Sequence, residues 1–337
     1  MTLHTGDSAE VLKQYSDNHF DSVVTDPPYG IEFLAKEWDK NTGPIEVWRE
    51  CLRVLKPGGH LLAFSAARKY HRLATNLEDI GFEIRDQIMW IYGSGFPKGQ
   101  DMGKLIEKRG NNGEDYMGWK TGLKPAHEPI VMARKPFKGS TIDNVLKHGT
   151  GAINIDDTRV GYISDYDKKH QHDIARGQDN ATNGVFFGGN GKTKASNHTP
   201  QGRYPANVIM SEEEGEGNEY SKYFYCPKVS RKERNIGCDM HEPITGKDVG
   251  PWSETGERLA VKLDKMTTKH NNHPTVKPVA LMKYLVTLIT PKGGKVLDPF
   301  NGSGSTGMAV KEFGGEYTGI DLDPNYIEIA NKRIAAW

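Results

Sequence analysis

An acid, two prolines and an aromatic residue form the first stretch that could do chemistry, Thr25-Asp26-Pro27-Pro28-Tyr29-Gly30. The apolar, β-branched run from Phe20 to Val24 just before it predicts a buried strand. Prolines cannot donate to a sheet ladder, so the strand ends there and Asp26 lies at its carboxyl end. Ligands of open α/β sheets bind at that edge, which makes the stretch a candidate site. An Asx-Pro turn beside a core tyrosine is the plainer interpretation.

A second candidate site follows a strand near the end of the chain. Lys295 to Leu297 predicts a short strand that ends in Asp298-Pro299-Phe300, and a glycine-rich turn, NGSGSTG, begins at Asn301. Gly302 and Gly304 let the backbone turn sharply and approach a ligand, because neither has a Cβ. A flexible Gly-Ser linker is the alternative, but predicted strands flank the turn on both sides.

The residues around this turn favour a nucleotide-type cofactor that carries positive charge. Asp321 ends the next predicted strand roughly twenty residues later, where a carboxylate can accept hydrogen bonds from ribose hydroxyls. The turn lacks the lysine of a phosphate-binding loop. Asp298 at the strand end would repel a phosphate but attract a sulfonium or an amino group. These features indicate S-adenosylmethionine.

Strands and helices alternate at both ends of the chain, which predicts an α/β sheet. Near the N-terminus we expect strands at 2–5, 20–24, 60–65 and 82–92, with helices at 8–15, 46–55 and 66–80. Near the C-terminus we expect helices at 278–290, 308–313 and 325–334, with strands at 295–297 and 317–320. The segment between them is loop-like apart from two strand-like runs, 128–133 and 207–210. It is too long for a simple connection, so it is an inserted domain or partly disordered.

Composition excludes several classes of protein. The 337 residues carry 44 Lys and Arg and 44 Asp and Glu, so nucleic acid could bind only through a local basic face. No apolar run is long enough to span a membrane, and the N-terminus has no signal-peptide pattern, so we expect a cytoplasmic protein. Three cysteines without a CxxC pair indicate a reducing compartment. Cys226, Cys238 and His241 match no common zinc spacing, so no metal is expected.

Three motifs in order along the chain carry a family resemblance. They are TDPPYG, HPTVKP at 273–278 and LDPFNGSGSTG at 297–307. With them the chain resembles the amino-methyltransferases of DNA, and the order, catalytic motif before cofactor motif, is that of their permuted β group. The runs AINIDDTR, GRYPANVI and YFYCPKVSRKERN are similar to phage and prophage adenine methylases.

The resemblance implies an α/β fold, a Rossmann-like S-adenosylmethionine-dependent methyltransferase sheet, circularly permuted, with a large inserted target-recognition region. It divides the chain into a catalytic half at 1–95, the inserted region at 96–270 and a cofactor-binding half at 271–337. The cell is then a bacterial or phage-infected one, and the partner is double-stranded DNA. A homodimer and a cognate restriction enzyme are further partners that the resemblance allows.

The resemblance also implies roles for individual residues. The cofactor would be held by Asp7 near the adenine ring, Thr275 and Lys277 at the methionine end, and Asp298, Phe300, Gly302, Gly304 and Asp321 around the rest. The reacting end would be formed by Asp26, Pro27, Pro28 and Tyr29.

Those residue types suit methylation of an exocyclic base amine, whose lone pair is delocalised into the ring. The Asp26 carboxylate and the Pro27 carbonyl can accept both N–H bonds, so that the lone pair points at the methyl group. Asp26 also offsets the positive charge that develops on nitrogen. The base must leave the duplex, and Tyr29 offers it an aromatic face.

A basic cluster in the inserted region is a candidate DNA contact. It consists of Lys228, Arg231, Lys232 and Arg234, beside the aromatic run Tyr223 to Tyr225. A solvated surface is the usual meaning of such runs, but a duplex partner gives the cluster a function.

We expect transfer to adenine N6, because related cytosine-N4 enzymes more often carry serine at the position of Asp26. That rule has exceptions, so cytosine N4 stays as the alternative. Methylation of RNA or of protein glutamine is a second alternative, although those relatives carry asparagine there and an earlier cofactor motif. A catalytically inactive DNA-binding relative is the third, and the intact acids argue against it.

Overall fold

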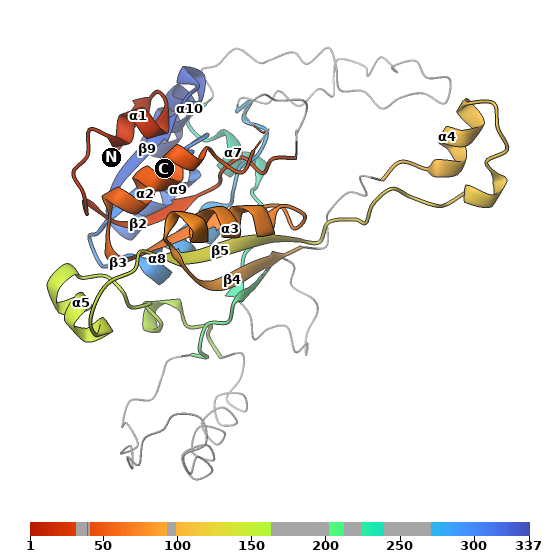
Figure 1. The fold of residues 1–337 in the computed structure, drawn as a ribbon. Coiled ribbons are helices and arrows are strands. Elements are labelled where there is room, and N and C mark those ends of the chain that lie inside the picture. The colour runs from red at the N-terminus through yellow and green to blue at the C-terminus, as the bar shows by residue number, and fades with distance from the viewer. Residues whose placement is uncertain (32–38, 40, 93–98, 163–201, 212–223, 239–270) are drawn as a thin grey trace, which may run out of the picture.

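The structure is a computed structural model, shown in Figure 1, and it describes residues 1–31, 39, 41–92, 99–162, 202–211, 224–238 and 271–337. At its centre is a nine-stranded sheet in the order β1-β9-β8-β2-β3-β5-β4-β6-β7. Every neighbouring pair is parallel except those of β5, which runs against both β3 and β4. The strands are β1 (Thr2–Thr5), β2 (Phe20–Thr25), β3 (Leu55–Phe64), β4 (Glu83–Ile91), β5 (His127–Arg134), β6 (Val208–Met210), β7 (Phe224–Tyr225), β8 (Lys295–Asp298) and β9 (Glu316–Asp321).

Helices cover both faces of this sheet (Figure 1). The α-helices are α1 (Ser8–Leu12), α2 (Ile45–Val54), α3 (Tyr70–Ile80), α4 (Met102–Lys108), α5 (Thr141–His148), α7 (Arg231–Asn235), α8 (Val279–Ile289), α9 (Ser305–Phe313) and α10 (Pro324–Ala336), and short 3-10 turns are η3 (Glu114–Tyr116) and η4 (Asp156–Thr158). Side chains of α1, α2 and α3 form one buried cluster with the sheet, and those of α8 and α9 form the other.

Alternation along the central strands explains why the sheet needs cover on both sides. Val23 faces the cluster under α1 to α3, and the next residue, Val24, faces the cluster under α8 and α9. Leu61 and Leu62 on β3 divide in the same way, and all four side chains are fully buried. A strand buried on both faces has a continuous apolar run instead of alternation, as Phe20 to Val24 does.

The central strand β2 joins the two ends of the chain. It pairs on one side with β3 and on the other with β8, where Ser22 lies opposite Val296 and Val23 opposite Leu297. Because both pairs are parallel, the carboxyl ends of β2 and β8 meet at the same edge. The DPPY stretch and the glycine-rich turn therefore lie side by side.

Most expected elements are present, with two informative differences. The Lys-Pro-Gly-Gly run at 56–59 was expected to end a helix, but it lies inside β3, which begins directly after α2. The sheet tolerates the proline because the pairing register of β2 and β3 shifts there, and the Pro57 carbonyl accepts bonds from Asn144 and Thr150 instead. Helix α3 begins at Tyr70, four residues later than expected.

The boundary expected at residue 95 does not coincide with an edge of the sheet. The run 128–133 belongs to β5, which is inserted between β3 and β4, and 207–210 contributes β6 beyond β4. The segment expected to be a separate inserted region thus supplies strands to the main sheet. Among the described segments, no helix has the length and apolar character needed to cross a membrane.

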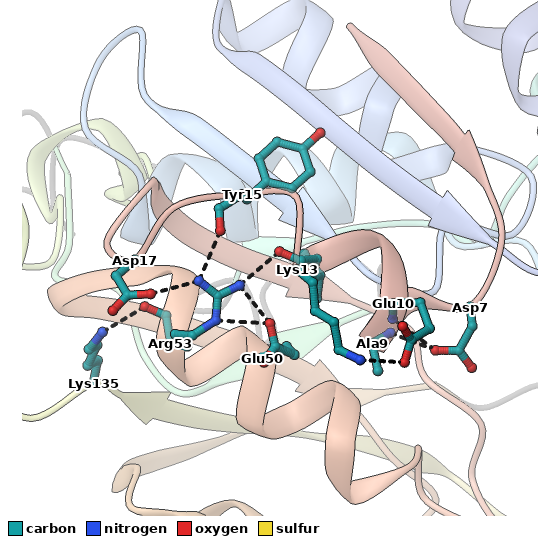
Figure 2. Close-up of polar contacts among 10 residues, drawn as sticks. Asp7, Ala9, Glu10, Lys13, Tyr15, Asp17, Glu50, Arg53 and Lys135 are labelled. Carbon is teal, nitrogen blue, oxygen red and sulfur yellow. Dashed lines mark hydrogen bonds and ion pairs between the residues drawn. The ribbon is translucent and has the colours of Figure 1, made fainter.

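Arg53 at the end of α2 fixes the connection between α1 and β2 (Figure 2). Its guanidinium donates to the carboxylates of Asp17 at 2.7 Å and Glu50 at 2.6 Å. It also donates to the backbone carbonyls of Leu12 and Tyr15, each at 2.9 Å. These bonds satisfy carbonyls at the end of α1 and hold that helix against α2.

Trp48 on α2 tests how far the helical layer supports the candidate site. Its side chain is fully buried, and its ring centroid lies 5.4 Å from that of Phe300. We expect Trp48→Ala to lower the free energy of unfolding by about 3–5 kcal/mol, because it removes the largest fully buried side chain. The matched control Trp119→Ala, at an exposed site, should change it by less than about 0.5 kcal/mol. Urea unfolding measures both, and equal losses would contradict the expectation.

Candidate active site

A pocket opens at the edge where β2 and β8 end. Its lining comes from three segments that are far apart in the sequence: Asp26 after β2, the stretch from His273 to Lys277 with Met282, and residues around the glycine-rich turn. Six of the residues singled out in the sequence line it, namely Asp26, Thr275, Lys277, Asp298, Phe300 and Gly302. The two candidate sites are therefore one site.

Asp298 is the most strongly held residue of this pocket. One carboxylate oxygen accepts a bond from the Thr25 hydroxyl at 2.6 Å and one from the Phe300 N–H at 3.1 Å. The other accepts a bond from the Thr306 hydroxyl at 2.6 Å. Burial raises the pKa of Asp298 to about 6, although these three bonds act in the opposite direction. The acid thus ties β2, β8 and α9 together beneath the pocket.

The glycine-rich turn uses its glycines for close packing. Gly302 has φ +49°, and a Cβ there would lie 2.7 Å from Nε2 of His273. Gly304 has φ +80°, and a Cβ there would lie 2.8 Å from the Cβ of Ala330 on α10. The expected reason for these glycines, close approach to a ligand, is thus replaced at Gly304 by close approach of a helix.

Asp321 and Asp7 lie beside this turn on the neighbouring strands. One oxygen of Asp321 accepts a bond from the Gly302 N–H at 2.8 Å, so the acid fixes the turn. Asp7 caps α1 and accepts bonds from the N–H groups of Ala9 at 2.8 Å and Glu10 at 3.2 Å (Figure 2). Neither residue lines the pocket itself.

The DPPY backbone is held by an acid that the sequence did not single out. Asp39 is almost fully buried, and one of its oxygens accepts bonds from the N–H of Tyr29 at 2.6 Å and of Gly30 at 3.0 Å. Since the prolines end the strand ladder, these bonds replace the sheet as the support of the turn. Gly30 adopts φ +65°, which lets the chain turn back at that point.

Asp26 is held by two donors. The Tyr29 hydroxyl donates to one of its oxygens at 2.8 Å, and the Lys277 ammonium donates to the other at 2.5 Å. The resemblance implied that Lys277 binds the carboxylate of the cofactor. Instead its ammonium lies on Asp26, because a nearly buried cation takes the nearest anion.

Glu128, the second residue of β5, completes this cluster and was missed. Its Oε2 accepts a bond from the Tyr29 hydroxyl at 3.0 Å and lies 3.4 Å from Nζ of Lys277. Its Oε1 accepts a bond from the Tyr92 hydroxyl at 3.3 Å. In the sequence Glu128 was only the first residue of a predicted strand; two tyrosines and a lysine that converge on it are visible only in the fold.

Burial and charge set the protonation of the cluster. Burial lowers the pKa of Lys277, but the carboxylates of Asp26 and Glu128 more than offset this, so its pKa lies above the ordinary value. Burial, followed by the same two carboxylates, raises the pKa of Tyr29 well above its ordinary value. At neutral pH the lysine is charged and the tyrosine keeps its proton.

Thr275 and the basic cluster differ in how far they face solvent. Thr275 is exposed, and its carbonyl bonds to Nδ1 of His273. Arg231 and Lys232 are exposed on α7, and exposed Lys228 lies with its ammonium 3.8 Å from the ring centroid of Tyr92.

Arg234 does not belong on the surface where it was expected. Its guanidinium donates to the backbone carbonyl of His273, and burial lowers its pKa. Asn271 in turn donates to the Arg234 carbonyl at 3.0 Å. Arg234 thus fixes α7 to the segment that leads into Lys277. Residues 222 and 223, His241 and Phe-containing residues 93–98 lie outside the described part of the chain.

An α/β sheet with one reversed strand and a glycine-rich pocket at its carboxyl edge defines the class of methyltransferase-like folds. A family model described as DNA methylase, that of the N6/N4 methyltransferases, matches residues 20–332, so the chain belongs to this family. The protein is thus a DNA methyltransferase, and its cofactor is S-adenosylmethionine.

Several known proteins are similar over most of the chain. The type II methyltransferase M.HindIII of Haemophilus influenzae is 24% identical, with 98% of this chain and 94% of its own covered. The type II methyltransferase M.HpaI of Haemophilus parainfluenzae is 24% identical, with 98% and 73% covered. M2.DpnII of Streptococcus pneumoniae is 37% identical over 31% of this chain and 34% of its own.

Two solved structures share the fold. The crystal structure of M1.HpyAVI has a TM-score of 0.50 and 16% identity, with 100% of this chain and 99% of that chain covered. The PvuII DNA methyltransferase, described as cytosine-N4-specific, has a TM-score of 0.52 and 14% identity, with 98% and 85% covered.

The raised pKa of Asp298 predicts a dependence of stability on pH. The ordinary pKa is 3.8 and the native value is about 6. As pH falls from about 6 to 4 the native state takes up a proton that the unfolded state does not, so this contribution stabilises the fold at low pH and is lost as pH rises. We expect the free-energy difference between wild type and Asp298→Asn to change by about 2 kcal/mol between pH 4 and pH 7. Parallel pH profiles in urea unfolding would refute the assignment.

Proposed function

We propose that the protein methylates the N6 amine of an adenine flipped out of duplex DNA, as a member of the permuted β group. The observation that carries this proposal is the position of the Asp26 carboxylate, which lines the same pocket as the glycine-rich turn. An acceptor for the target amine and the donor of the methyl group would then meet within one cavity.

The residues of the pocket fit S-adenosylmethionine by their chemistry. Its lining carries two carboxylates, those of Asp26 and Asp298, together with the hydroxyls of Ser303, Ser305 and Thr306. Such a lining suits a cofactor with a positive sulfonium and an amino group better than it suits a phosphate. Bound there, S-adenosylmethionine would supply the methyl group.

Each residue that the resemblance implied receives a place in this proposal. Asp298, Phe300, Gly302 and Thr275 would line the cofactor, and Gly304 would shape the turn. Asp321 would accept a bond from the ribose through whichever lone pairs the Gly302 N–H leaves. Asp7 would lie near the adenine ring, since the Ser8 hydroxyl next to it donates to the Pro299 carbonyl at 2.6 Å and so fixes the start of α1 at this edge.

At the reacting end, the protein would position the amine and take no covalent part. Asp26 and the Pro27 carbonyl would accept the two N–H bonds of the target amine, and Pro28 would keep the turn extended. The Asp26 charge would stabilise the cationic nitrogen as the bond to the methyl group forms. Tyr29, whose hydroxyl is fixed by Asp26 and Glu128, would present its ring to the base.

Cytosine N4 is the second candidate product, and one observation favours it. The PvuII enzyme, which shares the fold, is described as cytosine-N4-specific. Both reactions use an exocyclic amine and the same two acceptors, so the fold alone does not distinguish them. The acid at position 26 supports adenine. A type II modification role beside a restriction enzyme is consistent with the two Haemophilus relatives.

The direct test is to identify the nucleoside that becomes labelled. Unmethylated duplex DNA is incubated with methyl-labelled S-adenosylmethionine and digested, and we expect the label on N6-methyladenine. The matched control Asp26→Ala should lose at least about a hundredfold of the rate while binding DNA as wild type does, because the acceptor is gone but the DNA surface is not. Label on N4-methylcytosine would overturn the choice of base. A fully active Asp26→Ala would overturn the mechanism.

The exposed part of the basic cluster makes a separate prediction. Glutamine at Lys228, Arg231 and Lys232 should weaken DNA binding and reduce the slope of log affinity against log salt by up to about three units, roughly 0.9 for each lost phosphate contact. Lys147→Gln on α5 is the control, because α5 packs at the opposite edge of β3. Affinities over a salt series measure the slope, and an unchanged slope would remove the cluster from the interface.

A further inference from the structure

Two carboxylates share one ammonium in the cluster around Asp26. Nζ of Lys277 lies 2.5 Å from Asp26 and 3.4 Å from Glu128. The exposed fractions are 8% for the Lys277 side chain, 18% for Asp26 and 22% for Glu128. The ammonium also lies 4.8 Å from the ring centroid of Phe64 and 5.5 Å from that of Tyr29, so apolar rings surround it. A cation in such surroundings needs an anion beside it.

This arrangement conflicts with the step proposed for Asp26. Each of the two Asp26 oxygens already accepts a bond from the protein, one from Tyr29 and one from Lys277. Lys277 is the stronger competitor, because its bond is charge-assisted and the target amine is neutral. For the amine to take that position, the ammonium must leave Asp26. Leaving without a second anion would strand a buried charge.

We infer that Glu128 is a positioning residue that accepts the Lys277 ammonium when the target amine arrives at Asp26. The inference rests on the proposed function, since it describes how that site receives its substrate. Glu128 lies less than 1 Å further from Nζ than Asp26 does, so a small rotation of the lysine side chain exchanges one carboxylate for the other. No proton is transferred, and the lysine keeps its charge throughout.

The partners of Glu128 suit this role. The Tyr29 hydroxyl already donates to both carboxylates, so it can turn toward Glu128 at the same time and release the other Asp26 oxygen. The Tyr92 hydroxyl holds the far oxygen of Glu128 at 3.3 Å and keeps the acid in place. Without substrate, the ammonium occupies the position of the amine on Asp26, and the exchange opens that position.

A double-mutant cycle with single-turnover rates of methyl transfer tests the exchange. Glu128→Gln keeps an acceptor oxygen but removes the charge, so the ammonium stays on Asp26, and we expect the rate to fall by about tenfold or more. Equilibrium affinity for S-adenosylmethionine should stay within about twofold of wild type, because Glu128 does not line the cofactor pocket. In a Lys277→Met background the same Glu128→Gln change should cost less than about twofold, because no ammonium remains to be moved.

Controls separate this inference from the proposed function and from misfolding. Glu83→Gln removes the charge of an acid paired with Arg134 at the other end of the β4–β5 pair, and it should keep the wild-type rate. If Lys277→Met does not fold, Glu128→Asp decides: it retains a charge and should keep more of the rate than Glu128→Gln.

Three outcomes would overturn the inference. An equal loss from Glu128→Gln in both backgrounds would mean that Glu128 acts without Lys277. A Glu128→Gln enzyme at least as active as Glu128→Asp would mean that its charge is irrelevant. A wild-type protein that methylates no DNA would remove the proposed function and this inference together, whereas either of the first two results with an active wild type removes the inference alone.

Discussion

The hydrogen bond between the Thr25 hydroxyl and the Asp298 carboxylate is the constraint on which the site depends. It joins residues 273 positions apart in the sequence, at the carboxyl ends of two strands that lie next to each other in the sheet. The same carboxylate holds the start of α9 through Thr306 and the chain after β8 through the Phe300 N–H. Burying an acid is unfavourable unless its oxygens are bonded, and these three bonds are what the two halves of the chain provide together.

The polar groups around the pocket form a second level above this base. Asp321 fixes the glycine-rich turn and Asp39 fixes the DPPY turn, each through backbone N–H groups. Both turns lie where regular ladders have ended, so side-chain acceptors replace the missing partners. The reactive cluster of Asp26, Tyr29 and Lys277 therefore stands on turns that are rigid although they are not strands or helices.

The central strands and the meeting of the two motifs could be predicted from the sequence. Apolar runs that end in Asp26 and Asp298 identify buried parallel strands, and parallel neighbours place their carboxyl ends together. Glu128 could not be predicted, because β5 is reversed and brings its first residues, not its last, to that edge. The inward direction of Arg234 was equally hidden, because a five-residue helix has too few turns to show a periodic buried face. Lys277 was placed by family resemblance, and its actual partner depends on a carboxylate about 250 positions away.

The reversed strand has one more consequence. The chain leaves the sheet after β4 and returns at the start of β5 on the same edge, and the Tyr92 N–H donates to the Ala126 carbonyl at 2.9 Å where the two ends meet. The excursion between them carries α4, which lies well away from the sheet in Figure 1. A closed stem of this kind works like a socket: residues can be added to or removed from the excursion without shifting a single core strand. The enzyme core and the length of this appendage can therefore change independently of each other.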